Sequence, residues 1–135
     1  MILFNGLTLA YIGDAYYEMR VRQHSLDLGL TLVNDLHNLT VKYTNSKSQA
    51  LAANLLIEEF YSEEEIKIFK RGRNQTAKHK PKNVDVGTYN KSTGFEAVIG
   101  YLYLEKNWER LEQILEFTFE VIDKSYEESI VEKVL

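Results

Sequence analysis

Apolar residues recur at helical spacing along most of the chain, and no segment shows the sustained alternation of a β-strand. We therefore expect an all-α fold, with residues 1–135 forming one domain. The first helix is expected at about residues 7–28, where Gly29 ends it. Its apolar positions fall on nearly every side, which is typical of a central helix. The last helix is expected from Trp108 toward Val134, and its apolar stripe either closes the core or covers a subunit interface.

Polar motifs of the form Ser/Thr-x-x-Glu/Gln predict where the inner helices begin, because such residues cap each other's backbone N–H groups. The motif at 46–49 precedes a helix over 50–60, the motif at 62–65 begins a helix that ends near Gly72, and the motif at 93–96 begins a helix over 93–106. A shorter apolar segment lies around residues 32–39. The pattern thus predicts a series of helices along the chain.

The composition is that of a globular chain, with 44% hydrophobic residues in a length of 135. It has no run of eighteen apolar residues, so we expect no membrane span. Its first residues lack the basic and small-residue features of a secretory signal. The absence of cysteine excludes disulfides and thiolate metal sites and is consistent with a reducing compartment, so we expect a cytoplasmic protein.

The charge is unevenly distributed, and this changes the expected partner. A formal net charge of −4 alone argues against nucleic acid, but six Lys or Arg residues, one His and no acid lie between Lys70 and Lys82. Only the local field acts on a partner within a Debye length. This basic stretch is expected to belong to a connector over about residues 71–88, and loops of that length are usually functional or mobile.

Two acids stand in similar glycine-bearing frames about eighty positions apart, Asp14 after Gly13 and Glu96 two residues after Gly94. Both frames are expected to be buried helix, where an unpaired carboxylate is costly. A divalent cation shared between the two helices would compensate for both charges. Gly13 would let another backbone come close. The alternatives are that Asp14 pairs with a basic side chain or a backbone amide, and that Glu96 only caps the helix that begins at Thr93.

At these motifs the chain resembles the ribonuclease III catalytic-domain family. It is more similar to the compact Mini-ribonuclease III form, which lacks a double-stranded-RNA-binding domain. Residues 9–18 match the family's first-helix signature around Gly-Asp-Ala, residues 94–100 match the second acidic motif, and residues 71–82 resemble the basic connector of the compact form. The chain departs from the general family pattern at Leu7, Ala10 and Thr93, where further acids are usual. Of the four carboxylates that usually form the family's metal site, only Asp14 and Glu96 are present.

The resemblance implies a divalent-metal-dependent endoribonuclease that cleaves double-stranded RNA. It also implies a homodimer with two active sites along one groove, and a role in the maturation of ribosomal RNA precursors. Asp14 and Glu96 are then the expected catalytic and metal-binding residues, with Mg²⁺ or, as a substitute, Mn²⁺. The expected RNA contacts are Arg71, Arg73, Asn74, Lys78, Lys80 and Lys82. Two alternatives remain: a non-catalytic dimeric RNA-binding module of helices, and a protein-interaction domain whose basic loop meets an acidic protein.

Overall fold

The computed structural model of the protein describes residues 4–75 and 80–134 and confirms an all-α fold, with no strand in those ranges. The helices are α1 (Gly6–Asp27), α2 (Val33–Thr44), α3 (Ser46–Glu59), α4 (Glu63–Arg73), α5 (Val86–Leu104) and α6 (Trp108–Val134). Gly29 follows α1 with a φ of 95°, a conformation that suits glycine after a helix end. No helix in the described part of the chain combines the length and the apolar character that a bilayer crossing needs.

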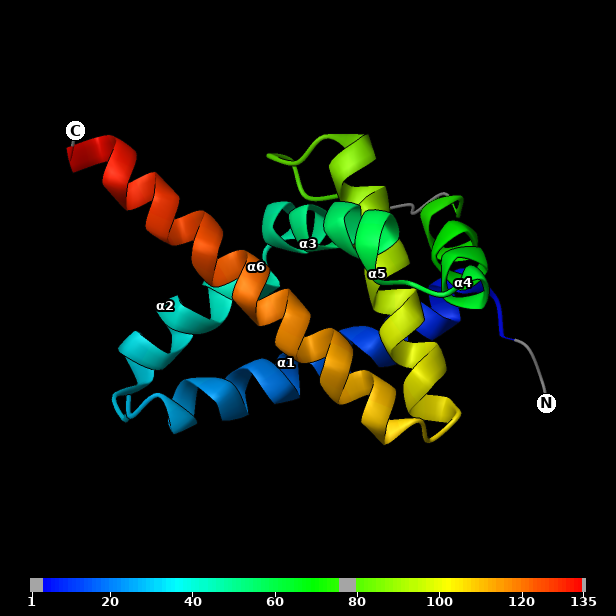
Figure 1. Ribbon diagram of the computed structural model, residues 1–135, viewed down its shortest axis with the longest axis horizontal. Helices are drawn as coiled ribbons and strands as arrows, with labels where there is room; N and C mark the ends of the chain where they lie inside the picture. Colours follow the sequence, from blue (N-terminus) through cyan, green and yellow to red (C-terminus); the bar gives the residue numbers. More distant parts are fainter. Residues whose placement is uncertain (1–3, 76–79, 135) are drawn as a thin grey trace.

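Helix α5 is the central helix of the fold, because α1, α3, α4 and α6 all pack against it (Figure 1). Its residues from Ser92 to Leu102 are buried, except Glu96 and Tyr101. The expectation that the first helix is central is wrong, since Tyr11 and Met19 of α1 are 76% and 64% exposed. The packing partners α2, α4 and α5 leave this outer side of α1 uncovered.

Helix α6 runs across the bundle and closes its core (Figure 1). Its apolar stripe is at most 1% exposed at Leu111, Ile114, Leu115 and Ile122. The stripe therefore packs within this chain, which decides between the two roles that the sequence left open for it.

The helix starts confirm one capping box and correct two. Ser62 and Glu65 cap each other's backbone N–H groups at the start of α4, at 3.2 and 2.9 Å. Helix α3 instead begins after Asn45, whose Oδ1 accepts from the Ser48 N–H at 2.9 Å. Helix α5 begins after Asp85, whose carboxylate accepts from the Thr88 N–H at 2.8 Å.

Thr93 and Glu96 consequently lie within α5 and do not begin it. The Thr93 hydroxyl donates to the Tyr89 carbonyl one turn earlier, as a threonine inside a helix commonly does. Glu96 therefore has no capping role, and its carboxyl group needs another explanation. The connector is also shorter than expected, since α4 continues to Arg73 and α5 begins at Val86.

Candidate active site at the crossing of α1 and α5

Helices α1 and α5 cross so closely that only glycine fits at the two contact points. A Cβ atom on Gly13 would overlap the carbonyl oxygen of Glu96, and a Cβ atom on Gly100 would overlap the carbonyl oxygen of Leu9. Asp14 directly follows one of these glycines, and Glu96 lies one turn before the other. The crossing therefore brings the two acids of the glycine-bearing frames to one place.

The carboxyl groups of Asp14 and Glu96 lie within hydrogen-bonding reach of each other. Burial raises the pKa of Glu96 well above its usual value, and the neighbouring Asp14 carboxyl raises it further. The expectation that both acids are buried is half correct: Glu96 is half-buried, whereas Asp14 is exposed on the uncovered side of α1. The result is a pair of adjacent acids that solvent reaches from the Asp14 side.

Among the described residues, no basic side chain neutralises this pair. Within residues 4–75 and 80–129, neither Asp14 nor Glu96 forms an ion pair with Lys, Arg or His. The buried Tyr17 is close enough for Glu96 to raise its pKa, after burial and the neighbouring Tyr43. Its hydroxyl, however, donates to the Tyr43 carbonyl at 2.9 Å. The structure therefore offers no support for the alternative in which Asp14 is a structural ion-pair residue.

Two carboxylates are a sparse donor set for a metal ion. No group of three or more His, Asp or Glu side chains that could hold a metal was found in the described residues. Ala10 and Thr93, where the general family pattern has acids, are buried. Nevertheless, two adjacent like charges that are partly withdrawn from water suit a hard divalent cation, which would relieve their repulsion and retain several waters as ligands.

Gln49 is a neighbour of this pair that the sequence interpretation missed. It was assigned to a capping motif, but Asn45 caps α3, and Gln49 lies 2% exposed beside Glu96. Its amide lowers the pKa of Glu96 while burial and Asp14 raise it. Within the described ranges, its Nε2 nevertheless meets no acceptor in regular hydrogen-bond geometry. In the sequence, the feature that could have pointed to Gln49 is a polar glutamine among the alanines of this helix.

The basic segment begins close to the acidic pair. Gly72, near the end of α4, packs so closely on α5 that a Cβ atom on it would lie 2.7 Å from the Ala97 Cβ and 3.0 Å from the Gly94 Cα. Ala97 directly follows Glu96 in α5. The close contact at Gly72 therefore fixes the end of α4 against α5, beside Glu96. Arg71 and Arg73 lie at this end of α4.

The basic side chains differ in the hydrogen bonds that they form within the protein. Arg71 Nη2 donates to the Phe4 carbonyl at 2.6 Å, so it holds the segment before α1. Arg73 Nε donates to Asn74 Oδ1 at 3.1 Å. Lys80 donates to backbone carbonyls of its own turn.

Lys82 is exposed, as is Asn74, and Lys78 lies outside the described residues. None of the described basic residues of the segment 71–82 forms an ion pair with a described acid. Their positive charge is therefore not neutralised by the part of the protein that the structure describes.

Comparisons with known proteins found relatives that cover most of the chain. Residues 7–107 match the Ribonuclease III domain family. The chain is 46% identical over 122 residues to "Mini-ribonuclease 3" of Streptococcus pneumoniae, covering 90% of this chain and 95% of that protein. It is likewise 46% identical to "Mini-ribonuclease 3" of Staphylococcus aureus, covering 90% and 92%. A crystal structure of a Fusobacterium nucleatum protein superposes with a TM-score of 0.78 at 31% identity, covering 87% of this chain and 93% of that one.

Proposed function

The chain belongs to the ribonuclease III family, and on that premise we propose that Asp14 and Glu96 are its catalytic, metal-binding pair. Membership of the family makes it an endoribonuclease that cleaves double-stranded RNA. The observation that carries the proposal is the crossing of α1 and α5, where Gly13 and Gly100 allow the two carboxyl groups to meet.

The ribonuclease III family is in general dependent on divalent metal ions. We assign Mg²⁺ to this site, with Mn²⁺ as a substitute, because both accept carboxylate oxygens and water as ligands. Asp14 would offer its oxygens from the solvent side, and Glu96 from the half-buried side. When bound, the cation would polarise the scissile phosphate, promote ionisation of the attacking water and stabilise the departing 3′-oxygen.

The basic segment 71–82 is assigned to the RNA backbone. Duplex RNA is recognised mainly through its shape, phosphates and 2′-hydroxyls, for which Lys and Arg are suited. Arg73, Lys80 and Lys82 support this role, because they form no ion pair with a described acid. Asn74 is an exposed polar contact. The assignment includes Arg71, although it also holds the Phe4 carbonyl, and Lys78, of whose structure nothing is described.

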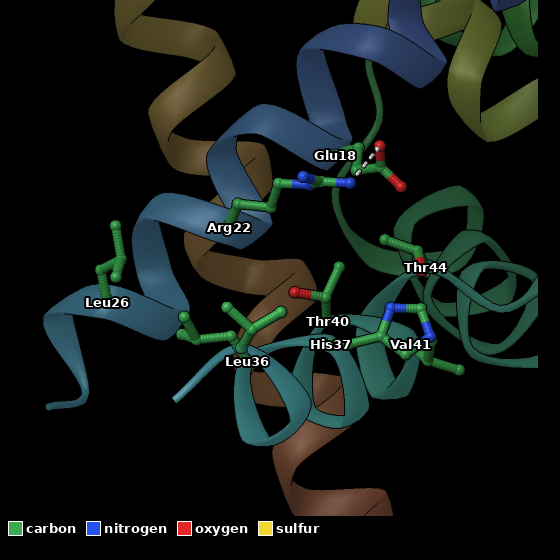
Figure 2. Close-up of a pocket in the computed structure, with 9 residues that line it drawn as sticks. Glu18, Arg22, Leu26, Leu36, His37, Thr40, Val41 and Thr44 are labelled. Carbon is green, nitrogen blue, oxygen red and sulfur yellow. Dashed lines mark hydrogen bonds and ion pairs between the residues drawn. The ribbon is translucent and has the colours of Figure 1, made fainter. Parts of the chain in front are cut away.

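We also propose a homodimer formed through the outer side of α1 and α2. Large apolar side chains are exposed there: Tyr11, Met19, Leu26, Leu32, Val33 and Val41. Contiguous exposed apolar surface is typical of protein interfaces. Figure 2 shows the groove of about 380 Å³ between these helices, with Leu26 of α1 on one wall and Leu36 of α2 on the other.

Asp14 lies one turn after Tyr11 on the same side of α1. A second copy on this surface would therefore place the two acidic pairs along one shared face. Sedimentation of the chain as a monomer at micromolar concentration would contradict the dimer.

Three further assignments complete the proposal. We treat residues 1–135 as one catalytic domain, because all six helices contribute to a continuous set of contacts. We place the enzyme in the cytoplasm, which the absence of cysteine supports. The proposed substrate is precursor ribosomal RNA, which rests on the family resemblance, and unchanged precursor ends in cells that lack the enzyme would contradict it.

The activity is tested by incubating the protein with a long RNA duplex, with and without Mg²⁺. We expect discrete products with 5′-phosphate and 3′-hydroxyl ends in Mg²⁺, and no cleavage in EDTA. A protein that binds the duplex but never cuts it would instead be the non-catalytic RNA-binding module. Single-stranded RNA of the same sequence is the control, and we expect it to stay intact.

A further inference from the structure

Gln49 has a buried amide donor whose hydrogen bond is not made in the described structure. The side chain lies in the first turn of α3 and is 2% exposed. Its Nε2 has no acceptor in regular geometry among the residues that the structure describes. Buried polar groups in native proteins are nearly always hydrogen-bonded, so an exception at a functional site needs an explanation.

The Glu96 carboxyl is an acceptor next to this amide. Helix α3 packs against α5 and brings the Gln49 side chain beside Glu96. An ionised carboxylate is a strong hydrogen-bond acceptor for an N–H donor.

Three described hydroxyl groups near Glu96 already donate to backbone carbonyls. Tyr17 donates to the Tyr43 carbonyl at 2.9 Å. Ser92 and Thr93, on the preceding turn of α5, both donate to the Tyr89 carbonyl, at 2.8 and 3.1 Å. Among these described neighbours, Gln49 is therefore the side chain whose donor lacks an acceptor.

We propose that Gln49 is a positioning residue whose Nε2 donates to the ionised Glu96 carboxylate and holds it facing Asp14, so that both share one cation. The inference rests on the proposed role of Asp14 and Glu96 as metal ligands. Carboxylate ligands are usually held by such a hydrogen bond, and its loss typically weakens metal binding by about 10–100-fold.

The test measures Mn²⁺ affinity of the full chain without RNA, by calorimetry or by the Mn²⁺ electron-spin-resonance signal. Gln49→Met keeps the unbranched shape of the side chain and removes the donor. We expect the Mn²⁺ dissociation constant to rise roughly 10-fold.

Thr118→Val is the matched control. The Thr118 hydroxyl is also fully buried without a partner, but it lies in α6. Its removal should leave Mn²⁺ binding unchanged. Each variant is measured well below its unfolding temperature, so that a change in stability does not imitate a change in affinity.

The outcomes separate this inference from the proposed function. Unchanged Mn²⁺ binding in Gln49→Met, with weakened binding in Asp14→Asn, would overturn the role of Gln49 alone. Unchanged binding in Asp14→Asn would overturn the proposed metal site itself.

Discussion

The backbone of Gly13 lies so close to the carbonyl oxygen of Glu96 that a single added methyl group would overlap it. Likewise, a methyl group added to Gly100 would overlap the carbonyl oxygen of Leu9. These contacts set the separation of α1 and α5, and with it the separation of the Asp14 and Glu96 carboxyl groups. The glycines therefore position the proposed catalytic pair although they bear no reactive group.

Gly13→Ala tests this dependence. In an open helix the change would stabilise the protein by up to about 1 kcal/mol. Here the added methyl must push α1 away from α5, so we expect a loss of about 1–3 kcal/mol in the free energy of unfolding. We also expect weaker cleavage of duplex RNA at saturating Mg²⁺. Urea unfolding and the cleavage rate measure the two effects.

Gly87→Ala is the matched control, because the nearest atom to its added Cβ, Asp85 Oδ1, lies at an ordinary 3.4 Å. This variant should retain the activity of the natural chain, and its stability should be unchanged or higher by up to about 1 kcal/mol. A Gly13→Ala enzyme with natural stability and a natural cleavage rate would contradict the close contact.

Asp14→Asn removes one proposed ligand and keeps the shape of the side chain. A divalent cation contributes several kcal/mol to such a reaction, so we expect cleavage to fall by at least about 100-fold. Duplex RNA binding in EDTA should change little. Glu96→Gln should behave similarly, because Glu96 lies inside α5 and has no capping role that the substitution could disturb. Asp27→Asn, an exposed acid at the end of α1, is the control and should cleave normally.

Lys80→Ala and Lys82→Ala together test the basic segment. If both lysines contact phosphates, the slope of log affinity against log salt concentration should decrease in magnitude by roughly 2. Binding measured from low to high salt gives the slope directly. Lys124→Ala, an exposed lysine of the acidic α6, should leave it unchanged. An unaltered slope in the double variant would show that other residues hold the RNA.

Glu65 predicts how stability depends on pH. Burial disfavours its ionised form, but hydrogen bonds from Arg110 and Ser62 and the charge of Arg110 outweigh burial, so the pKa of Glu65 lies below its usual value. A lowered carboxyl pKa stabilises the fold above about pH 4.3, and this contribution is lost as the pH falls through the pKa of the folded protein.

Glu65→Gln should therefore be about 1.5–3 kcal/mol less stable at pH 7, and the difference should shrink toward pH 3. Urea unfolding across this range measures it. Two curves that stay parallel from pH 7 to pH 3 would contradict the predicted role of the Arg110 hydrogen bonds, which measure 2.8 Å at both carboxylate oxygens.

The helices were predictable from the sequence where local signals decide them. Apolar spacing and the end signal at Gly29 identified the first helix, and the capping box at Ser62 identified α4. The starts of α3 and α5 were misplaced because Asn45 and Asp85 cap them from within polar stretches, where several residues offer the same chemistry. A capping motif shows that a residue can cap a helix, and the backbone conformation of the surrounding turn decides whether it does.

The site was predictable only in part, because it depends on contacts between distant segments. Glycine-bearing frames and the family resemblance singled out Asp14 and Glu96. The exposure of Asp14 did not follow from its apolar surroundings, since the sequence does not say which side of α1 its neighbours cover. Gln49 could not be placed beside Glu96 without knowing how α3 packs on α5.

The most direct measurement is the anomalous diffraction of Mn²⁺ in crystals of the full chain. The account predicts one strong peak between α1 and α5, with oxygens of Asp14 and Glu96 either at about 2.1–2.2 Å or one water molecule away. Crystals of Asp14→Asn should lose the peak. A Mn²⁺ ion bound elsewhere on the molecule, with the Asp14 and Glu96 carboxyl groups pointing away from it, would contradict the account.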